Sequence, residues 1–164
     1  MPKPLVYVET SVIGYLTSWP SRDPIVAGHQ QATKEWWEIA PSNVELFISE
    51  LVIVECAAGD EQAAAERLQV LQGLQRIAPT EAAAKLTEAL LLGKAVPSSE
   101  PRDAAHIALA ASHGVEFLVT WNFRHIANVG CRAAIEEICR EAGFEPPMIC
   151  SPESLLGKDA GDVV

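Results

Sequence analysis

Residues 5–16 read Leu5-Val6-Tyr7-Val8-Glu9-Thr10-Ser11-Val12-Ile13-Gly14-Tyr15-Leu16. A run rich in β-forming residues ends in an acid, a Thr-Ser pair suited to a helix start follows, and a second apolar run comes next. This order predicts a buried strand that delivers Glu9 to its carboxyl end. In an open parallel α/β sheet, ligands bind in the crevice beyond the carboxyl ends of the strands. Glu9 is therefore the first candidate for chemistry.

Two further acids interrupt apolar runs. Glu55 lies within residues 51–58, and Asp103 opens the Ala-rich residues 103–111. Burying an unpaired carboxylate is costly unless a proton, a cation or hydrogen bonds compensate. Each acid alone is explained by a helix cap or a solvent-facing position. Together with Glu9, however, they indicate a shared cation.

The composition describes an acidic globular protein. The 164 residues fit one domain, 49% of them are hydrophobic, and the formal net charge is -10. Affinity for nucleic acid comes mainly from Lys and Arg, so this charge argues against a broad, passive nucleic-acid coat. It leaves room for an enzyme with local Arg residues, and clustered acids attract divalent cations or a basic partner.

The four cysteines form no CxxC pair and no dense framework; they are Cys56, Cys131, Cys139 and Cys150. Without a signal peptide or an 18-residue apolar span, the sequence predicts reduced thiols in a cytoplasmic protein that does not enter a membrane. His125, Cys131 and Cys139 lack the spacing of zinc ligands, so we set zinc aside.

Strand-like and helix-like segments alternate along the rest of the chain. The predicted strands are residues 45–48, 76–78, 115–121 and 147–150. The predicted helices are residues 24–40, 49–59, 60–73, 80–92, 103–114 and 132–142, with another starting at Ser151. This alternation predicts an α/β sandwich around a parallel sheet. We expect one domain over residues 1–157 and a flexible tail over residues 158–164.

With these residues in view, the chain resembles the PIN-domain nucleases, and in particular the VapC-like toxins of bacterial toxin–antitoxin pairs, from about Leu5 to Leu156. The family pattern has an acid before Thr-Ser at the end of the first strand, an acid in the third helix, an acid opening a later Ala-rich helix and a polar residue after the next strand. In this sequence the pattern falls on Glu9, Thr10, Ser11, Glu55, Asp103 and Asn122. The resemblance implies a PIN-like three-layer α/β/α sandwich around a central parallel β-sheet.

Two positions depart from the family pattern. The first acid is usually Asp, and Glu9 places its carboxylate one carbon–carbon bond further out, ~1.5 Å. The fourth position is commonly Asp in a Thr-x-Asp context, whereas this chain has Thr120-Trp121-Asn122. An amide carries no charge, so it binds a cation less strongly than a carboxylate. Residues 121–128 look like those of a divergent branch that carries both changes.

The resemblance implies a ribonuclease that depends on Mg²⁺ or Mn²⁺ and acts as the toxin of a type II toxin–antitoxin pair. Glu9, Glu55 and Asp103 would be the metal ligands, and Asn122 would orient a water or a phosphate. Ser11 would hydrogen-bond an acid or the metal shell. Arg102, Arg124 and Arg132 are candidates for phosphate contacts, with a solvated charge as the alternative for each.

Several polar residues near these positions receive structural interpretations. Asp60 and Glu100 are outer candidates for the site, and we favour a surface acid as the interpretation of each. His106 lies one turn beyond Asp103 and either tunes that acid or sits in the wall of the site, and we favour the wall. His125 and Asn128 are expected to hold the loop after the strand.

The resemblance also implies single-stranded or structured RNA as substrate, and a small antitoxin whose tail fills the crevice. Trp36 and Trp37 are expected in the core or on a partner-facing surface. Exposed apolar positions on the helices around Trp19, Trp36 and Trp37 would suit that partner or a homodimer. A rival interpretation, supported by the two departures, is a catalytically weak or inactive PIN-like module that binds RNA or protein. A haloacid dehalogenase-type phosphatase requires a second Asp two residues after the first acid, where this chain has Ser11. A pure scaffold leaves the three acids unexplained.

Overall fold

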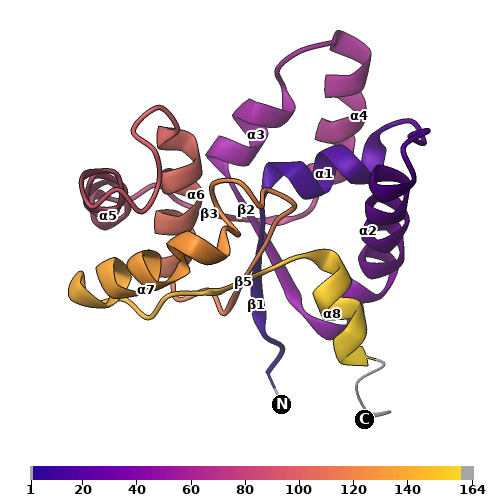
Figure 1. Ribbon diagram of the computed structural model, residues 1–164. Coiled ribbons are helices and arrows are strands. Elements are labelled where there is room, and N and C mark those ends of the chain that lie inside the picture. The colour runs from indigo at the N-terminus through magenta and orange to yellow at the C-terminus, as the bar shows by residue number, and fades with distance from the viewer. Residues whose placement is uncertain (1, 160–164) are drawn as a thin grey trace.

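A central parallel sheet organises the protein, as the computed structural model, which describes residues 2–159, shows (Figure 1). Its five strands follow the order β3-β2-β1-β4-β5, and every neighbouring pair is parallel. The strands are β1 (Leu5–Val8), β2 (Glu45–Ser49), β3 (Gln75–Ile77), β4 (Phe117–Val119) and β5 (Met148–Cys150). In the register of the two central strands, Val8 pairs with Val119. Both strands therefore end at the same level.

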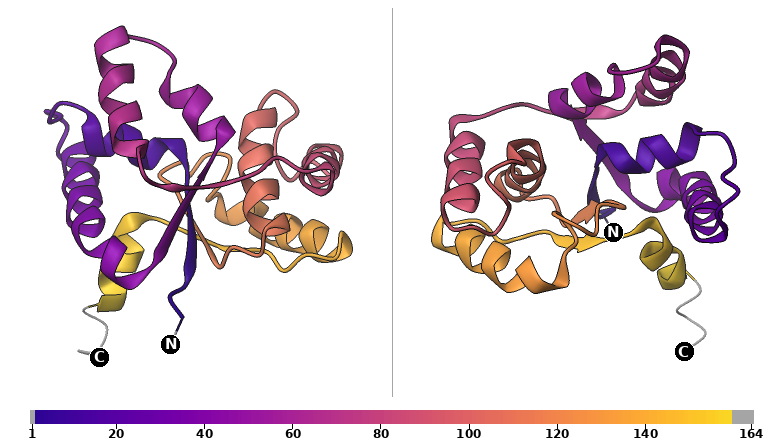
Figure 2. Two further views of the ribbon diagram at one scale, coloured as in Figure 1. Left: turned by 180° about the vertical axis from the view of Figure 1, so that it is seen from behind. Right: turned by 45° about the horizontal axis from the view of Figure 1, so that its top comes forward.

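Helices cover both faces of this sheet. One side carries α1 (Thr10–Thr17), α2 (Pro24–Asn43) and α8 (Pro152–Asp159), and the other carries α5 (Glu81–Leu92), α6 (Pro101–Ser112) and α7 (Arg132–Glu141). The two views of Figure 2 show these two layers, with α3 (Glu50–Cys56) and α4 (Glu61–Leu71) beyond the carboxyl ends of the strands. A 3₁₀ turn, η1 (Val129–Cys131), precedes α7. The predicted three-layer α/β/α sandwich is confirmed.

The core lies around β1 and α6. Val6, Tyr7 and Val8 are fully buried, as expected of a parallel strand covered on both faces. Seven of the 12 residues of α6 are buried as well, which explains the Ala-rich sequence of this helix. Trp36 is only 2% exposed and lies in the core, one of the two positions expected for it, whereas Trp19 is 89% exposed.

Element boundaries differ from the predictions in several places. The helix that carries Asp103 begins at Pro101, because proline suits the first helical position. The strand predicted over residues 115–121 is only Phe117–Val119, and the helix containing Glu55 ends at Cys56. Helix α2 continues through Pro41 to Asn43. Helix α8 runs to Asp159, past the expected domain end, and residues 160–164 of the expected tail lie outside the described residues.

None of the four cysteines forms a disulfide. Burial raises the pKa of Cys56, Cys139 and Cys150 to about 11, so these three thiols remain protonated at neutral pH. They are therefore poor nucleophiles. In the part of the chain that the structure describes, no helix has the length and apolar character needed to cross a membrane.

Candidate functional site

The order of the strands in the sheet indicates where a ligand-binding site would lie. From β1 the chain moves outward through β2 to β3, then returns to the other side of β1 as β4 and continues to β5. The direction of strand addition thus reverses between β1 and β4. In open α/β sheets the ligand crevice lies at this reversal, beyond the carboxyl ends of the strands. Glu9 directly follows β1, and Thr120 directly follows β4.

Glu9 is held by both of these turns. Its backbone N–H donates to the Val119 carbonyl at 3.1 Å, and its Oε1 accepts from Ser11 Oγ and, at 2.6 Å, from Thr120 Oγ1. Ser11 Oγ in turn accepts from the Trp121 N–H at 2.8 Å. The side chain is 5% exposed, although Glu9 is the N-cap residue of α1. These hydroxyl groups fix the direction of the longer glutamate side chain.

Glu55 is held by a chain of buried polar groups. Its Oε1 accepts from Thr10 Oγ1 and from His106 Nε2, each at 2.6 Å. His106 Nδ1 lies 2.7 Å from the hydroxyl of Tyr7, which also lies 2.7 Å from Ser49 Oγ. Because a carboxylate only accepts, the Nε2 atom of His106 carries a proton. The completely buried His106 thus connects Glu55 to the core strand β1.

The pKa of Glu55 lies below its usual value. Burial acts to raise it, but the hydrogen bond and charge of His106, the Thr10 hydroxyl and the charge of Arg102 together outweigh burial. Glu55 is therefore ionised at neutral pH. The same burial raises the pKa of Tyr7, so Tyr7 keeps its proton.

This lowered pKa predicts a pH-dependent stability. The folded protein holds the Glu55 carboxylate ionised to lower pH than the unfolded chain, in which its pKa is near 4.5. The stabilisation is fully present above pH 4.5 and is lost as pH falls through the lower folded-state pKa. We expect wild-type protein to exceed Glu55→Gln in unfolding free energy at neutral pH, with the difference shrinking below pH 4.5 in urea titrations. Exposed Glu137→Gln is the control, and a pH-independent difference for Glu55→Gln would contradict the assignment.

Asp103 meets a histidine from the loop after β4. Its Oδ2 accepts from His125 Nδ1 at 3.0 Å. Glu100, the N-cap residue of α6, completes a group whose candidate ligand atoms all lie within 4.8 Å of one another. Glu100 is half-buried and lies beside Asp103, so the structure favours the outer-candidate interpretation over that of a surface acid. Sequence reasoning also missed the contact between His125 and Asp103.

A second group adjoins the first one. The candidate ligand atoms of Glu9, Glu55 and His106 also lie within 4.8 Å of one another. Asp103 and His106 occupy successive turns of α6, so this helix places the two groups next to each other. The sequence left open whether His106 tunes Asp103 or sits in the wall. The structure buries it in the wall, where its partner is Glu55.

The remaining predicted residues differ in their positions. Asn122 Oδ1 accepts from the His125 N–H at 2.9 Å, so this amide shapes the loop. Arg102 and Arg124 are exposed, and Arg102 is near enough to lower the pKa of Glu55. Asn128 donates to the Arg124 carbonyl at 3.0 Å and holds the loop as expected. Asp60 caps α4 and is not part of either group.

The acids fit a hard divalent cation. In Glu9, Glu55 and Asp103, hydrogen bonds from the protein engage one carboxylate oxygen, and the other accepts none within the described residues. No buried polar side-chain atom in residues 2–156 lacks a partner, so these second oxygens reach solvent. Carboxylate oxygens are the ligands that Mg²⁺ and Mn²⁺ prefer. His106 has both ring nitrogens engaged, which favours an orienting role over a ligand role.

Comparison with known proteins agrees with this geometry. The PIN domain family matches residues 6–130. The chain belongs to the PIN domain family. The match spans the segments that carry Glu9, Glu55, Asp103 and Asn122, so the resemblance seen in the sequence is confirmed.

Two solved structures share this PIN fold. VapBC2 from Rickettsia felis, solved bound to a promoter DNA fragment, is similar with a TM-score of 0.54 and 17% identity, over 73% of this chain and 89% of that chain. VapC20 from Mycobacterium tuberculosis, described as a toxin that cleaves the sarcin–ricin loop, is similar with a TM-score of 0.55 and 15% identity, over 79% of this chain and 94% of that chain. Among curated proteins, no sequence matches significantly.

Proposed function

We propose that this PIN-domain protein is a metal-dependent endoribonuclease and the toxin of a type II toxin–antitoxin pair. One observation carries the proposal: Glu9 and Glu55 converge beyond β1, with Asp103 one helical turn from their His106 neighbour. Each of these acids has a carboxylate oxygen available for a ligand. Such convergence at the switch point is costly unless a cation offsets the repulsion.

The chain's own residues have distinct roles in phosphodiester hydrolysis. When bound, Mg²⁺ or Mn²⁺ supplies an acidified water and charge stabilisation at the phosphate. Glu9, Glu55 and Asp103 would hold the cation, with Thr10, Thr120 and the two histidines orienting them. Orienting groups of this kind typically change metal affinity or activity by about 10–100-fold. Ser11 belongs with them through its hydrogen bond to Glu9.

Arginines would position the substrate. Arg102 and Arg124 are exposed beside the acids and would contact phosphate oxygens. Asn122 would orient a water or phosphate through its amide nitrogen, because its carbonyl oxygen is engaged by the His125 N–H. An uncharged fourth position leaves the three acids to supply the negative charge of the site.

Partners follow from the family and from the structural neighbours. A VapBC complex and a toxin that cleaves the sarcin–ricin loop support an antitoxin partner and an RNA target. We include a homodimer and a cytoplasmic location in the proposal. The exposed Trp19 is available for a partner surface.

The test is cleavage of a mixed RNA pool by purified protein with Mg²⁺, with Mn²⁺ and with chelator. We expect cleavage with either metal and none with chelator. Folded, antitoxin-free protein that cuts under no metal would contradict the proposal. That result would favour the second candidate, a PIN-like binding module, for which the specific observation is Asn122 in place of an acid.

A further inference from the structure

Phe123 combines exposure with a position beside the site. It directly follows Asn122, and its side chain is 49% exposed. The loop that carries it is tied to the acids, because His125, two residues further on, contacts Asp103 at 3.0 Å. An exposed aromatic ring keeps apolar surface in contact with water, and burying that surface against a ligand is favourable. Phe123 is therefore a candidate for ligand contact.

The ring of Phe123 is held in place from behind. It makes edge-type contacts with Trp121, at a centroid distance of 5.8 Å, and with His29, at 6.3 Å. His29 stacks on Trp121 at 4.1 Å, and the Trp121 indole N–H donates to Thr33 Oγ1 at 2.8 Å. The loop backbone is closed by the Ala127 N–H, which donates to the Asn122 carbonyl at 2.8 Å. The ring is therefore already ordered before a ligand binds, which lowers the entropy cost of binding.

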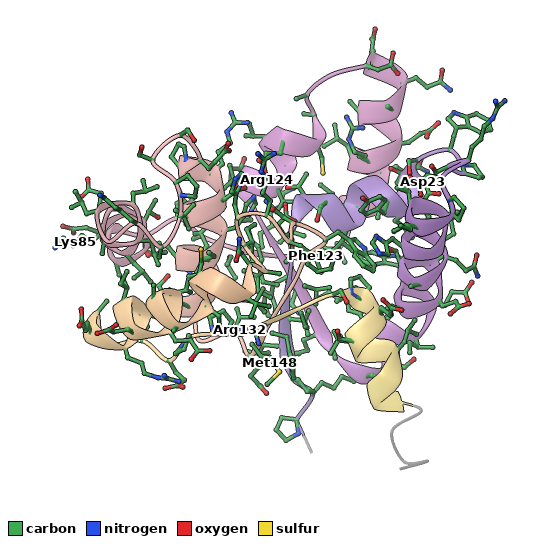
Figure 3. The ribbon with its side chains drawn as sticks, viewed as in Figure 1. Asp23, Lys85, Phe123, Arg124, Arg132 and Met148 are labelled. Carbon is green, nitrogen blue, oxygen red and sulfur yellow. The ribbon has the colours of Figure 1, made fainter. Side chains whose placement is uncertain are left out.

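A groove continues from Phe123 along the edge strand β5. Its lining residues are Phe123, Ala127, Val129, Arg132, Met148, Ile149, Cys150, Ser151 and Ser154. Arg132 is the cation among them, and none is an acid, in a chain with 22 Asp and Glu residues. Figure 3 shows Arg124 above Phe123, toward α3 and α1, and Arg132 and Met148 below it. The groove therefore pairs exposed apolar surface with positive charge.

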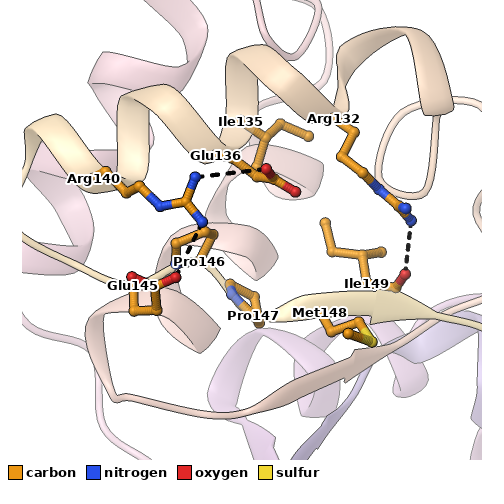
Figure 4. Close-up of a pocket in the computed structure, with 9 residues that line it drawn as sticks. All are labelled: Arg132, Ile135, Glu136, Arg140, Glu145, Pro146, Pro147, Met148 and Ile149. Carbon is orange, nitrogen blue, oxygen red and sulfur yellow. Dashed lines mark hydrogen bonds and ion pairs between the residues drawn. The ribbon is translucent and has the colours of Figure 1, made fainter.

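A neighbouring hollow, whose lining includes Glu136, Arg140 and Glu145, differs from this groove in its charges. There Arg140 forms ion pairs with Glu136, at 3.7 Å, and with Glu145, at 3.1 Å, as drawn in Figure 4. Its positive charge is neutralised. Arg132, which lines both hollows, instead donates to the Ile149 carbonyl at 3.1 Å, a neutral acceptor, and forms no ion pair with an acid among the described residues.

We propose that Phe123 stacks on an unpaired base next to the cleaved phosphodiester, and that the groove with Arg132 binds the continuing single strand. This inference rests on the proposed function and adds to it a base-stacking residue and a groove for the continuing strand. Aromatic rings stack bases of any sequence, and arginines contact the backbone. A base inside a duplex is stacked on its neighbours and does not reach such a ring. The positive charge of Arg132, in a groove whose described lining contains no acid, favours a polyanion over an apolar protein segment.

The test measures binding without cleavage. Anisotropy of a short fluorescein-labelled oligouridine is titrated with wild-type protein in chelator, and with Phe123→Ala, Phe123→Leu and Phe123→Trp. We expect Phe123→Ala and Phe123→Leu to weaken binding by about 10–100-fold, and Phe123→Trp to retain it, because stacking rather than apolarity is required. Arg132→Gln should weaken binding and its salt dependence. Leu92→Ala, which truncates an exposed apolar residue on α5, is the control.

The outcomes separate this inference from the proposed function. The inference would be overturned if Phe123→Ala bound the oligouridine as tightly as wild type does. It would also be overturned if Phe123→Leu and Phe123→Trp lost the same amount of affinity. Either result would assign the ring to a protein partner. If Phe123→Ala weakened the binding of an RNA duplex by the same factor as that of the single strand, the inference would also be overturned. Phe123-dependent binding in a protein that cleaves nothing with metal would instead refute the nuclease while keeping the stacking site.

Discussion

Asp103→Asn is expected to lower RNA cleavage by about 100-fold or more while leaving the fold intact. Loss of one carboxylate charge from a cation site removes several kcal/mol of charge stabilisation, and each ~1.4 kcal/mol is a factor of ten in rate. Asparagine has nearly the same shape as aspartate, and its carbonyl oxygen accepts from His125 Nδ1 as Asp103 Oδ2 does. The contact between α6 and the loop after β4 is therefore kept.

The measurement is the initial cleavage rate on one RNA under matched Mg²⁺, together with the circular dichroism and urea midpoint of each variant. Glu137→Gln removes an exposed acid of α7 and should change neither quantity. Titration with Mn²⁺ should show weaker binding to Asp103→Asn. Cleavage within a factor of about three of wild type, by a variant that binds Mn²⁺ normally, would remove Asp103 from the proposed site.

The sequence predicted the parts of this molecule that depend on neighbouring residues. The run from Leu5 to Glu9 contains both the strand and the acid that follows it, and the alternation of elements led to the parallel sandwich. Glu9 and Thr120 meet because β1 and β4 pair with Val8 opposite Val119. Once the sheet was predicted, acids at strand ends were expected at one edge.

Side-chain pairing across long separations had no local signal. His106 is 99 residues from Tyr7 and 51 from Glu55 in the sequence. The residues next to each of these three give no indication of which side chain it contacts. The one available hint was periodic: His106 lies in an otherwise apolar stretch of α6 and requires a buried partner. His125 was assigned to the loop alone, because its distance from Asp103 depends on how the loop after β4 folds back over α6.

Exposure of aromatic residues was equally hard to predict. Trp36 and Trp37 follow each other in α2, yet Trp36 is buried and Trp37 only partly so. Phe123 carries no periodic signal, because it lies outside any helix or strand. Its exposure results from the Trp121 and His29 rings, which occupy the space behind it.

His106→Ala is expected to lower the free energy of unfolding by about 3–5 kcal/mol, because truncating a large buried side chain leaves a cavity and unpaired polar groups. His106 is fully buried, and its two ring nitrogens bridge Tyr7 and Glu55. Removal leaves the Tyr7 hydroxyl with Ser49 alone and releases one of the two donors to Glu55 Oε1. Urea denaturation at neutral pH measures this loss.

Tyr7→Phe separates stability from site geometry in the same hydrogen-bonded chain. It removes only the hydroxyl that contacts Ser49 and His106, so we expect a smaller loss of about 1–3 kcal/mol. His106 Nε2 still donates to Glu55 in this variant, so cleavage per folded molecule should fall far less than in His106→Ala. Equal losses of cleavage in both variants, measured where both are fully folded, would mean that His106 acts through the core rather than by orienting Glu55. A much larger loss in His106→Ala, carried by kcat rather than KM, is the outcome expected of a histidine that positions a metal-binding carboxylate.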